Sequence, residues 1–236
     1  MEGDSVNACR KQMDRLENKG FRLYSAFEME YTLFDAETNE PAFDKNDMHS
    51  ALIFSELEDY FFTLETNLIK AGVDTEGMQT EFGPGQIEFM MNPQWDIKTA
   101  DDTFIFREAA KEVATQVGKK AVFMSKPSEK CLNSGCHFNF SIWDKAGNNL
   151  FQGEDGRLSD FGRHFIAGLC KHGAALTAVC SPTVNCYRRY TYPFSPKLIN
   201  WGYDNRLTAF SVKLQGHKGP RIENRLVGSA FNPYWF

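Results

Sequence analysis

The sequence has no long apolar run. Its 236 residues contain no stretch that approaches the ~20 consecutive apolar residues of a membrane-spanning helix. Residues 1–20, which read MEGDSVNACRKQMDRLENKG, also lack the apolar segment of a secretory signal peptide. We therefore expect a cytoplasmic protein without a membrane partner.

Clustered positive charge and paired cysteines are missing too. The net charge is −5, the isoelectric point is near 5.6, and no run of Lys and Arg is present, which argues against nucleic acid as a partner. The six cysteines show no CxxC pair and no zinc-like spacing, so we expect reduced thiols. No repeat, low-complexity tract or Gly/Ser/Pro-rich linker divides the chain, which indicates one domain.

The sequence is instead rich in apolar residues that follow helix and strand periods. With 42% hydrophobic residues it can bury a sizeable core. Helical spacing of apolar residues predicts three helices, at 50–70, 99–117 and 160–180. Strand-like runs occupy 22–34, 78–91, 120–125, 136–142, 207–214 and 221–226. Because strands and helices do not alternate regularly, we predict an α+β fold with a curved, mainly antiparallel sheet flanked by helices.

One of these runs, AFEMEYTLF at 26–34, carries two glutamates inside an otherwise apolar segment. In a strand, Glu28 and Glu30 share one face while Met29 and Tyr31 share the other. Two neighbouring carboxylates repel each other. The pattern therefore indicates either a face in water or a face that holds a cation.

The same pattern recurs in three further segments. In TEFGPGQIEFM a Gly-Pro-Gly turn separates Glu81 from Glu88, and in CHFNFSI and RIENRL alternate positions place His137 and Glu223 on polar faces. Five glutamates and one histidine suit hard cations such as Mg²⁺ or Mn²⁺, and nearby arginines suit phosphate or carboxylate. The spacing is compatible with phosphoryl transfer and equally with a solvated polar face, since no P-loop or kinase-type glycine-rich loop is present.

Eight segments, taken in order, carry a family resemblance. They read FEMEYTLFD, EGMQTEFGPGQIEFM, FMSKP, SGCHFNFSIW, AGLCKHGAAL, SPTVNCYRRY, WGYDNR and RIENRLVGSAFNPY, and together they resemble the catalytic domain of glutamine synthetases. The resemblance implies that residues 1–236 form a partial catalytic domain without the family's N-terminal β-grasp domain and C-terminal helical region. It also implies a ligase that phosphorylates the γ-carboxylate of glutamate with ATP and lets ammonia, or another amine, displace phosphate. Without the two missing regions, residues 1–236 alone are expected to be weakly active or inactive.

The resemblance further implies a role for particular residues. Two divalent cations, Mg²⁺ or Mn²⁺, are expected as cofactors, and ATP as cosubstrate. One cation is expected on Glu30, Glu81 and Glu88, and the other on Glu28, His137 and Glu223. The remaining expected site residues are catalytic Arg189 and Arg206, substrate-binding Asn133, Arg189 and Arg225, and ATP-binding Glu76, Ser141, Arg206 and Arg221. Glutamate, ATP and ammonia or an amine are the expected partners, with a homo-oligomer in the full-length protein.

Some positions depart from the family pattern. Ser211 stands where a phosphate-binding arginine is expected, with Lys213 as a partial substitute, and Ser195 stands near the place of an ammonia-handling glutamate. Leu132-Asn133 replaces the usual Asn-Gly. The segments FRLYSAF, WGYDN and QGHKGPRIEN are similar to lengsin, a lens relative regarded as structural or chaperone-like, so a catalytically inactive protein is the alternative. The histidines expected not to bind metal are His49, His164, His172 and His217.

Overall fold

One open sheet organises the molecule. The computed structural model describes residues 4–44, 48–192, 194–216 and 218–235. In these residues the strand order is β2-β3-β1-β6-β9-β8-β7, and β4 and β5 also pair with β1. The strands are β1 (Phe21–Asp35), β2 (Thr75–Thr80), β3 (Gln86–Met91), β4 (Gln94–Trp95), β5 (Lys119–Val122), β6 (Cys136–Asp144), β7 (Trp201–Tyr203), β8 (Phe210–Lys213) and β9 (Arg221–Asn224). Every pairing is antiparallel except that of β7 with β8.

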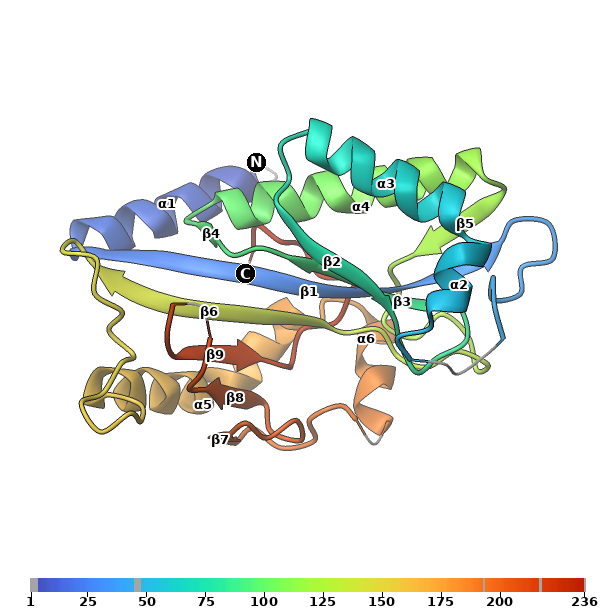
Figure 1. Cartoon of the computed structure of the whole chain (residues 1–236). Helices are drawn as coiled ribbons and strands as arrows, with labels where there is room; N and C mark the ends of the chain where they lie inside the picture. The colour runs from blue at the N-terminus through green and yellow to red at the C-terminus, as the bar shows by residue number, and fades with distance from the viewer. Residues whose placement is uncertain (1–3, 45–47, 193, 217, 236) are drawn as a thin grey trace.

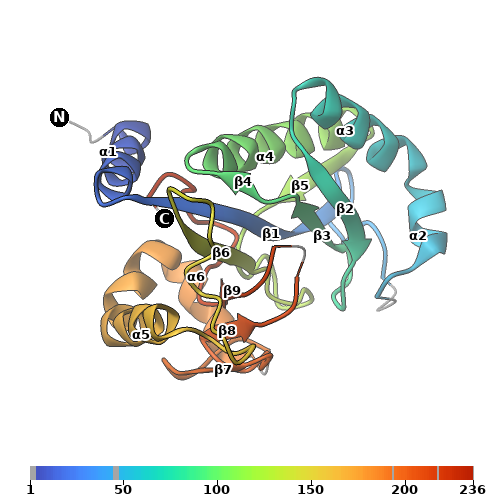
Figure 2. The same ribbon diagram turned by 60° about the vertical axis from the view of Figure 1, so that its left-hand side comes forward.

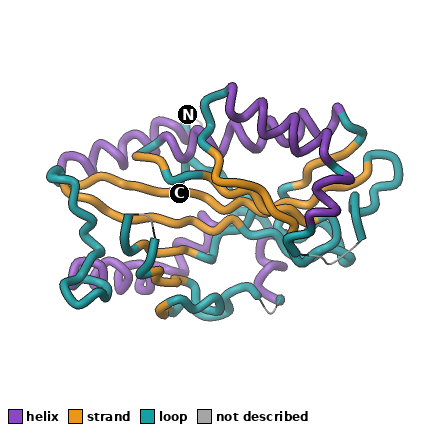
Figure 3. The backbone as a smooth tube through the Cα atoms, viewed as in Figure 1, coloured by secondary structure: helices purple, strands orange, loops and turns teal. Residues whose placement is uncertain are grey.

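Helices lie outside the sheet (Figure 3). They are α1 (Ser5–Asn18), α2 (Ala51–Glu56), α3 (Glu58–Lys70), α4 (Lys98–Gln116), α5 (Asp160–Cys180), α6 (Val184–Arg188) and the 3-10 turn η1 (Arg189–Thr191). Figures 1 and 2 show α1, α3 and α4 next to β1, and α5 past β6, near β8 and β9. This arrangement of an open, mostly antiparallel sheet with flanking helices confirms the predicted fold class.

Aromatic contacts join the helices to the sheet. The Phe89 ring of β3 stacks on Phe106 of α4 with a centroid distance of 3.9 Å. The Phe140 ring of β6 lies 5.8 Å from that of Phe165 in α5. Burying such rings removes a large apolar area from water, and the polar face of the sheet is thereby fixed on the opposite side.

The sequence-based elements agree closely with the structure, with identifiable exceptions. The helix expected at 50–70 is broken at Leu57 into α2 and α3. The run 78–91 is two strands joined at the Gly-Pro-Gly turn, as that triplet predicts. Helix α1 was not predicted; Asp4 caps it by accepting a hydrogen bond from the Val6 backbone N–H at 3.1 Å. The short elements β4, β7 and α6 were not predicted either.

Gly85, in the turn between β2 and β3, offers a test of how this turn is held. Its φ is +66°, and an added Cβ would lie 2.5 Å from the Leu33 carbonyl oxygen. Gly118 is a matched control, because its φ is +68° and nothing lies within 4 Å of an added Cβ. We expect Gly118→Ala to cost about 1 kcal/mol of unfolding free energy, and Gly85→Ala about 2 kcal/mol more from the clash. Urea unfolding measures both, and equal losses would contradict this account of the turn.

Candidate metal and nucleotide site

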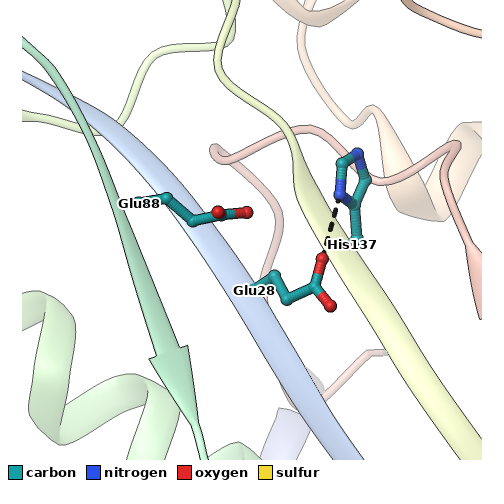
Figure 4. A group of neighbouring side chains, drawn as sticks. All are labelled: Glu28, Glu88 and His137. Carbon is teal, nitrogen blue, oxygen red and sulfur yellow. Dashed lines mark hydrogen bonds and ion pairs between the residues drawn. The ribbon is translucent and has the colours of Figure 1, made fainter. Parts of the chain in front are cut away.

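Strand register brings the polar residues of four strands together. Where β1 pairs with β3, Glu30 lies opposite Glu88, and where β1 pairs with β6, Glu28 lies opposite His137. Asn139 of β6 is in turn opposite Glu223 of β9. The central strand thus aligns its two glutamates with Glu88 of one neighbour and His137 of the other. Figure 4 shows Glu28, Glu88 and His137 directed toward the same space.

A cavity of about 390 Å³ lies over this part of the sheet. All six side chains that the sequence analysis chose as ligands line it: Glu28, Glu30, Glu81, Glu88, His137 and Glu223. Three of them, Glu88, His137 and Glu223, are buried in the described structure. One ligand atom each from Glu28, Glu88 and His137 lies within 4.8 Å of the other two, a spacing that one cation can bridge.

One half of the cluster centres on His137. Its Nδ1 lies 3.3 Å from Glu28 Oε2 and 3.5 Å from Glu223 Oε1. Arg225 forms an ion pair with Glu223 Oε1, and Lys213 Nζ lies 3.5 Å from Glu223 Oε2. That Oε2 atom is buried and has no hydrogen-bond donor among the described residues. A buried carboxylate oxygen without a donor is available to a cation.

The other half centres on Glu30, Glu81 and Glu88. Gln79 donates hydrogen bonds to both Glu81 and Glu88. Gln86 Nε2 lies 2.9 Å from Glu30 Oε2, which also accepts the Gly135 backbone N–H at 2.9 Å. Neither glutamine was among the residues predicted for the site. The only signal for them was their place beside Glu81 and Glu88 on β2 and β3.

Burial and mutual repulsion change the ionisation of this cluster. Burial, together with the nearby charges of Glu30, Glu28 and Glu81, raises the pKa of Glu88 to about 9. Burial also raises the pKa values of Glu28 and Glu81. Burial, together with the Arg225 charge, lowers the pKa of His137 to about 4. The imidazole is therefore neutral at pH 7, which is the form that binds a metal.

A second cavity, of about 620 Å³, adjoins the first. Glu76 and Ser141, which the resemblance assigns to ATP, both line it. Glu28 and Arg221 line both cavities. Arg221 is held in place by donating from Nε to Asn139 Oδ1 at 3.0 Å. The two cavities therefore share one acidic and one basic side chain.

The remaining arginines lie at different depths. Arg206 and Arg225 line the smaller cavity. Arg189 is buried and is not among the described residues that line it. Its guanidinium donates to the Arg225 carbonyl oxygen at 3.0 Å and lies behind Gly135, where an added Cβ would be 2.7 Å from its NH2. Arg189 thus supports the floor on which Arg225 and Gly135 sit.

The positions that depart from the family pattern also surround the smaller cavity. Asn133 lines it and donates from Nδ2 to Ser195 Oγ at 3.0 Å, which joins two loops. Ser211 lies opposite Glu223 in the pairing of β8 with β9, is fully buried, and has no hydrogen-bond partner for its hydroxyl among the described residues. Lys213 lies on the same strand and lines the cavity.

The histidines outside the cluster lie in different places. His49 is exposed and lines the smaller cavity. His164 and His172 are exposed on α5. His217, also expected not to bind metal, lies outside the described residues.

Several known proteins have sequences similar to this chain. A profile of the family "Glutamine synthetase, catalytic domain" matches residues 2–236. The chain is 35% identical to a glutamine synthetase of Pyrococcus furiosus over 98% of this chain and 53% of the relative. It is 29% identical to a glutamate–isopropylamine ligase of a Pseudomonas species, over 97% and 52%. It is 32% identical to lengsin of Canis lupus familiaris, over 96% and 40%.

Solved structures are similar to this chain as well. The structure "GmaS/ADP complex-Conformation 1" superposes with a TM-score of 0.88 at 28% identity, over 98% of this chain and 55% of that one. The chain spans about half the length of the curated relatives it matches. Among the residues that the structure describes, no helix has the length and apolar content needed to cross a bilayer.

The first prediction from this site concerns metal-dependent stability. Carboxylates crowded into one cavity repel each other, so Mn²⁺ or Mg²⁺ should raise the melting temperature by binding only the folded chain. At a concentration a hundredfold above Kd, the gain is about 2.7 kcal/mol. Glu223→Gln and His137→Ala should weaken metal affinity about tenfold or more. His164→Ala, on exposed α5, is the control. The same metal response in all three variants would contradict the site.

The second prediction concerns the proton that a bound cation displaces from Glu88. The folded pKa of Glu88 lies above its usual value of 4.5. Its protonated carboxyl therefore contributes stability at low pH, and this contribution is lost as the pH rises through about 9. At pH 7 a bound cation should displace about one proton per chain. Calorimetry in two buffers of different ionisation enthalpy measures this release. It should vanish in Glu88→Gln, and equal heats in both buffers for the unsubstituted chain would refute it.

Proposed function

Because this chain belongs to the glutamine synthetase catalytic-domain family, we propose that it is part of an ATP- and divalent-cation-dependent ligase. The reaction joins the γ-carboxylate of glutamate to ammonia or a primary amine through γ-glutamyl phosphate. The observation that carries the proposal is the meeting of five glutamates and one histidine in a cavity that shares Glu28 and Arg221 with a larger one. We propose a homo-oligomer for the full-length protein.

The donor set fits two hard cations, Mg²⁺ or Mn²⁺. We assign Glu28, His137 and Glu223 to one cation and Glu30, Glu81 and Glu88 to the other. Glu88 lies between the two groups, because one of its carboxylate oxygens is also within 4.8 Å of ligand atoms of Glu28 and His137. Carboxylate oxygens and a neutral imidazole suit such ions. When bound, the cations supply charge neutralisation for the phosphoryl group in transfer.

The chain's own residues position the reactants. The larger cavity takes the nucleotide, with Glu76 and Ser141 in its lining and Arg221 facing the phosphates at its boundary. The smaller cavity takes glutamate, with Arg225 and Asn133 as substrate-binding groups in its lining. Arg206 faces the transferring phosphate, and Arg189 acts by holding Arg225 from behind. Positive groups aimed at one point lower the energy of charge that develops there.

An inactive binding protein is the second candidate. Ser211, with its buried and unpaired hydroxyl, favours it, because this serine stands where the family carries a phosphate-binding arginine. The similarity to lengsin adds to this reading. The six ligand side chains, which are all present, favour the ligase. Turnover by the full-length protein decides between the two candidates: equal amounts of amide and phosphate from ATP, glutamate and an amine identify a ligase, whereas nucleotide binding without amide from any amine identifies the second candidate.

Nucleotide binding tests the proposed site directly. We expect the chain to bind Mg·ADP, and Arg221→Ala to weaken that binding about tenfold, since a charge-assisted hydrogen bond contributes about 1.5–3 kcal/mol. Arg188→Ala is the matched control, because Arg188 is exposed on α6 and lines neither cavity. Isothermal titration measures the three affinities. Failure of the unsubstituted chain to bind Mg·ADP, or equal affinities in all three, would exclude this nucleotide site.

A further inference from the structure

Lys213 is the last residue of β8, and its side chain lines the smaller cavity. Its Nζ donates a hydrogen bond to Asp204 Oδ1 at 2.6 Å and lies 3.5 Å from Glu223 Oε2. The two carboxylates differ in their surroundings, because the side chain of Asp204 is 82% exposed and that of Glu223 is 4% exposed. Lys213 therefore connects a carboxylate in water to a carboxylate of the proposed metal cluster.

A second cation lies beside Lys213 on the neighbouring strand. The pairing of β8 with β9 places Lys213 directly opposite Arg221, and both side chains line the smaller cavity. Like charges at directly opposite positions destabilise a sheet. Arg206 and Arg225 line the same cavity. Because the acids of this cavity are assigned to cations, these positive groups favour a ligand with several negative oxygens, such as a nucleotide phosphate.

The contact between Lys213 and Glu223 is an ion pair without a hydrogen bond. The distance of 3.5 Å allows Coulomb attraction, and Glu223 Oε2 accepts no hydrogen bond from the described residues. A divalent cation on this oxygen, at about 2.0–2.6 Å, would lie within about 6 Å of the Lys213 ammonium group. The two positive charges would repel each other. Lys213 is therefore held by Glu223 only as long as Glu223 carries no cation.

We propose that Lys213 is an exchangeable counter-ion that couples cation binding to phosphate binding. In the cation-free chain its ammonium group neutralises Glu223. When Glu223 binds a divalent cation, the ammonium group leaves Glu223 and donates a hydrogen bond to a terminal phosphate oxygen of the nucleotide. The remaining contact with Asp204 is weak enough to exchange, because Asp204 is exposed. This inference rests on the proposed function, since it requires a cation on Glu223 and a bound nucleotide.

The first measurement is the Mn²⁺ affinity of the chain without nucleotide, by electron paramagnetic resonance. Lys213→Met removes the competing positive charge, so the affinity should rise about threefold. Because this gain acts through Glu223, it should fall to less than about twofold when Lys213→Met is added to Glu223→Gln. Lys197→Met is the charge-matched control, since Lys197 is exposed and lines neither cavity, and it should leave the Mn²⁺ affinity unchanged.

The second measurement is the affinity for adenylyl imidodiphosphate, an ATP analogue that is not hydrolysed, by isothermal titration in saturating Mg²⁺. Lys213→Met should weaken this affinity about tenfold, because a charge-assisted hydrogen bond to phosphate is lost. AMP, which has no terminal phosphates, should bind Lys213→Met and the unsubstituted chain equally. Lys213→Arg keeps the charge and should recover most of the affinity for the analogue. Lys213→Gln should give the same results as Lys213→Met, and it replaces that variant if it does not fold.

The outcomes separate this inference from the function on which it rests. The expected result is a higher Mn²⁺ affinity together with a lower analogue affinity in Lys213→Met, a pair of opposite changes that a folding defect cannot produce. An unchanged or lower Mn²⁺ affinity, an equal gain in the Glu223→Gln background, or an unchanged analogue affinity overturns the exchange and leaves the ligase proposal standing. Failure of the unsubstituted chain to bind the analogue with Mg²⁺ overturns both.

Discussion

Repulsion among five carboxylates is the constraint on which this structure depends. The central strand β1 cannot move by one residue without turning Glu28 and Glu30 into the core. Its apolar face, with Met29 and Tyr31 fully buried, fixes the register, and the register then places Glu30 beside Glu88 of β3 and Glu28 beside His137 of β6. Core packing therefore maintains an electrostatically unfavourable face. Such an arrangement is understandable when the face serves to bind positive charge.

Neighbouring polar groups reduce the repulsion among these carboxylates. Gln79 and Gln86 donate to the acids of one half, and Arg225 pairs with Glu223 in the other. Ser229 Oγ donates a hydrogen bond to the Gly135 carbonyl oxygen at 2.8 Å, and the backbone N–H of Gly135 donates to Glu30 Oε2. These contacts orient the carboxylates before any cation arrives. Orientation in advance reduces the entropy lost on binding. The buried Glu223 Oε2, which accepts no hydrogen bond from the described residues, is available to a metal.

Much of this could be predicted from sequence because strand periodicity is local. Alternation separated Glu28 and Glu30 from the core residues between them, and the Gly-Pro-Gly triplet indicated the turn between β2 and β3. The features that could not be predicted depend on residues that are far apart in the sequence. Gln86 is informative only once β3 lies beside β1, and the contact of Phe82 with Phe194 joins two loops 112 positions apart by their numbering. Helix α1 was missed because it has no buried residue to mark a core face.

The central claim is that β1, β3, β6 and β9, with the loop that carries Glu81, form a site for two divalent cations. Counting bound Mn²⁺ by electron paramagnetic resonance tests it most directly, since free and bound ions give different signals. The account predicts two ions per folded chain, and one or none when Glu28→Gln and Glu30→Gln are combined. No binding by the folded chain, or two ions in both proteins, would contradict the account.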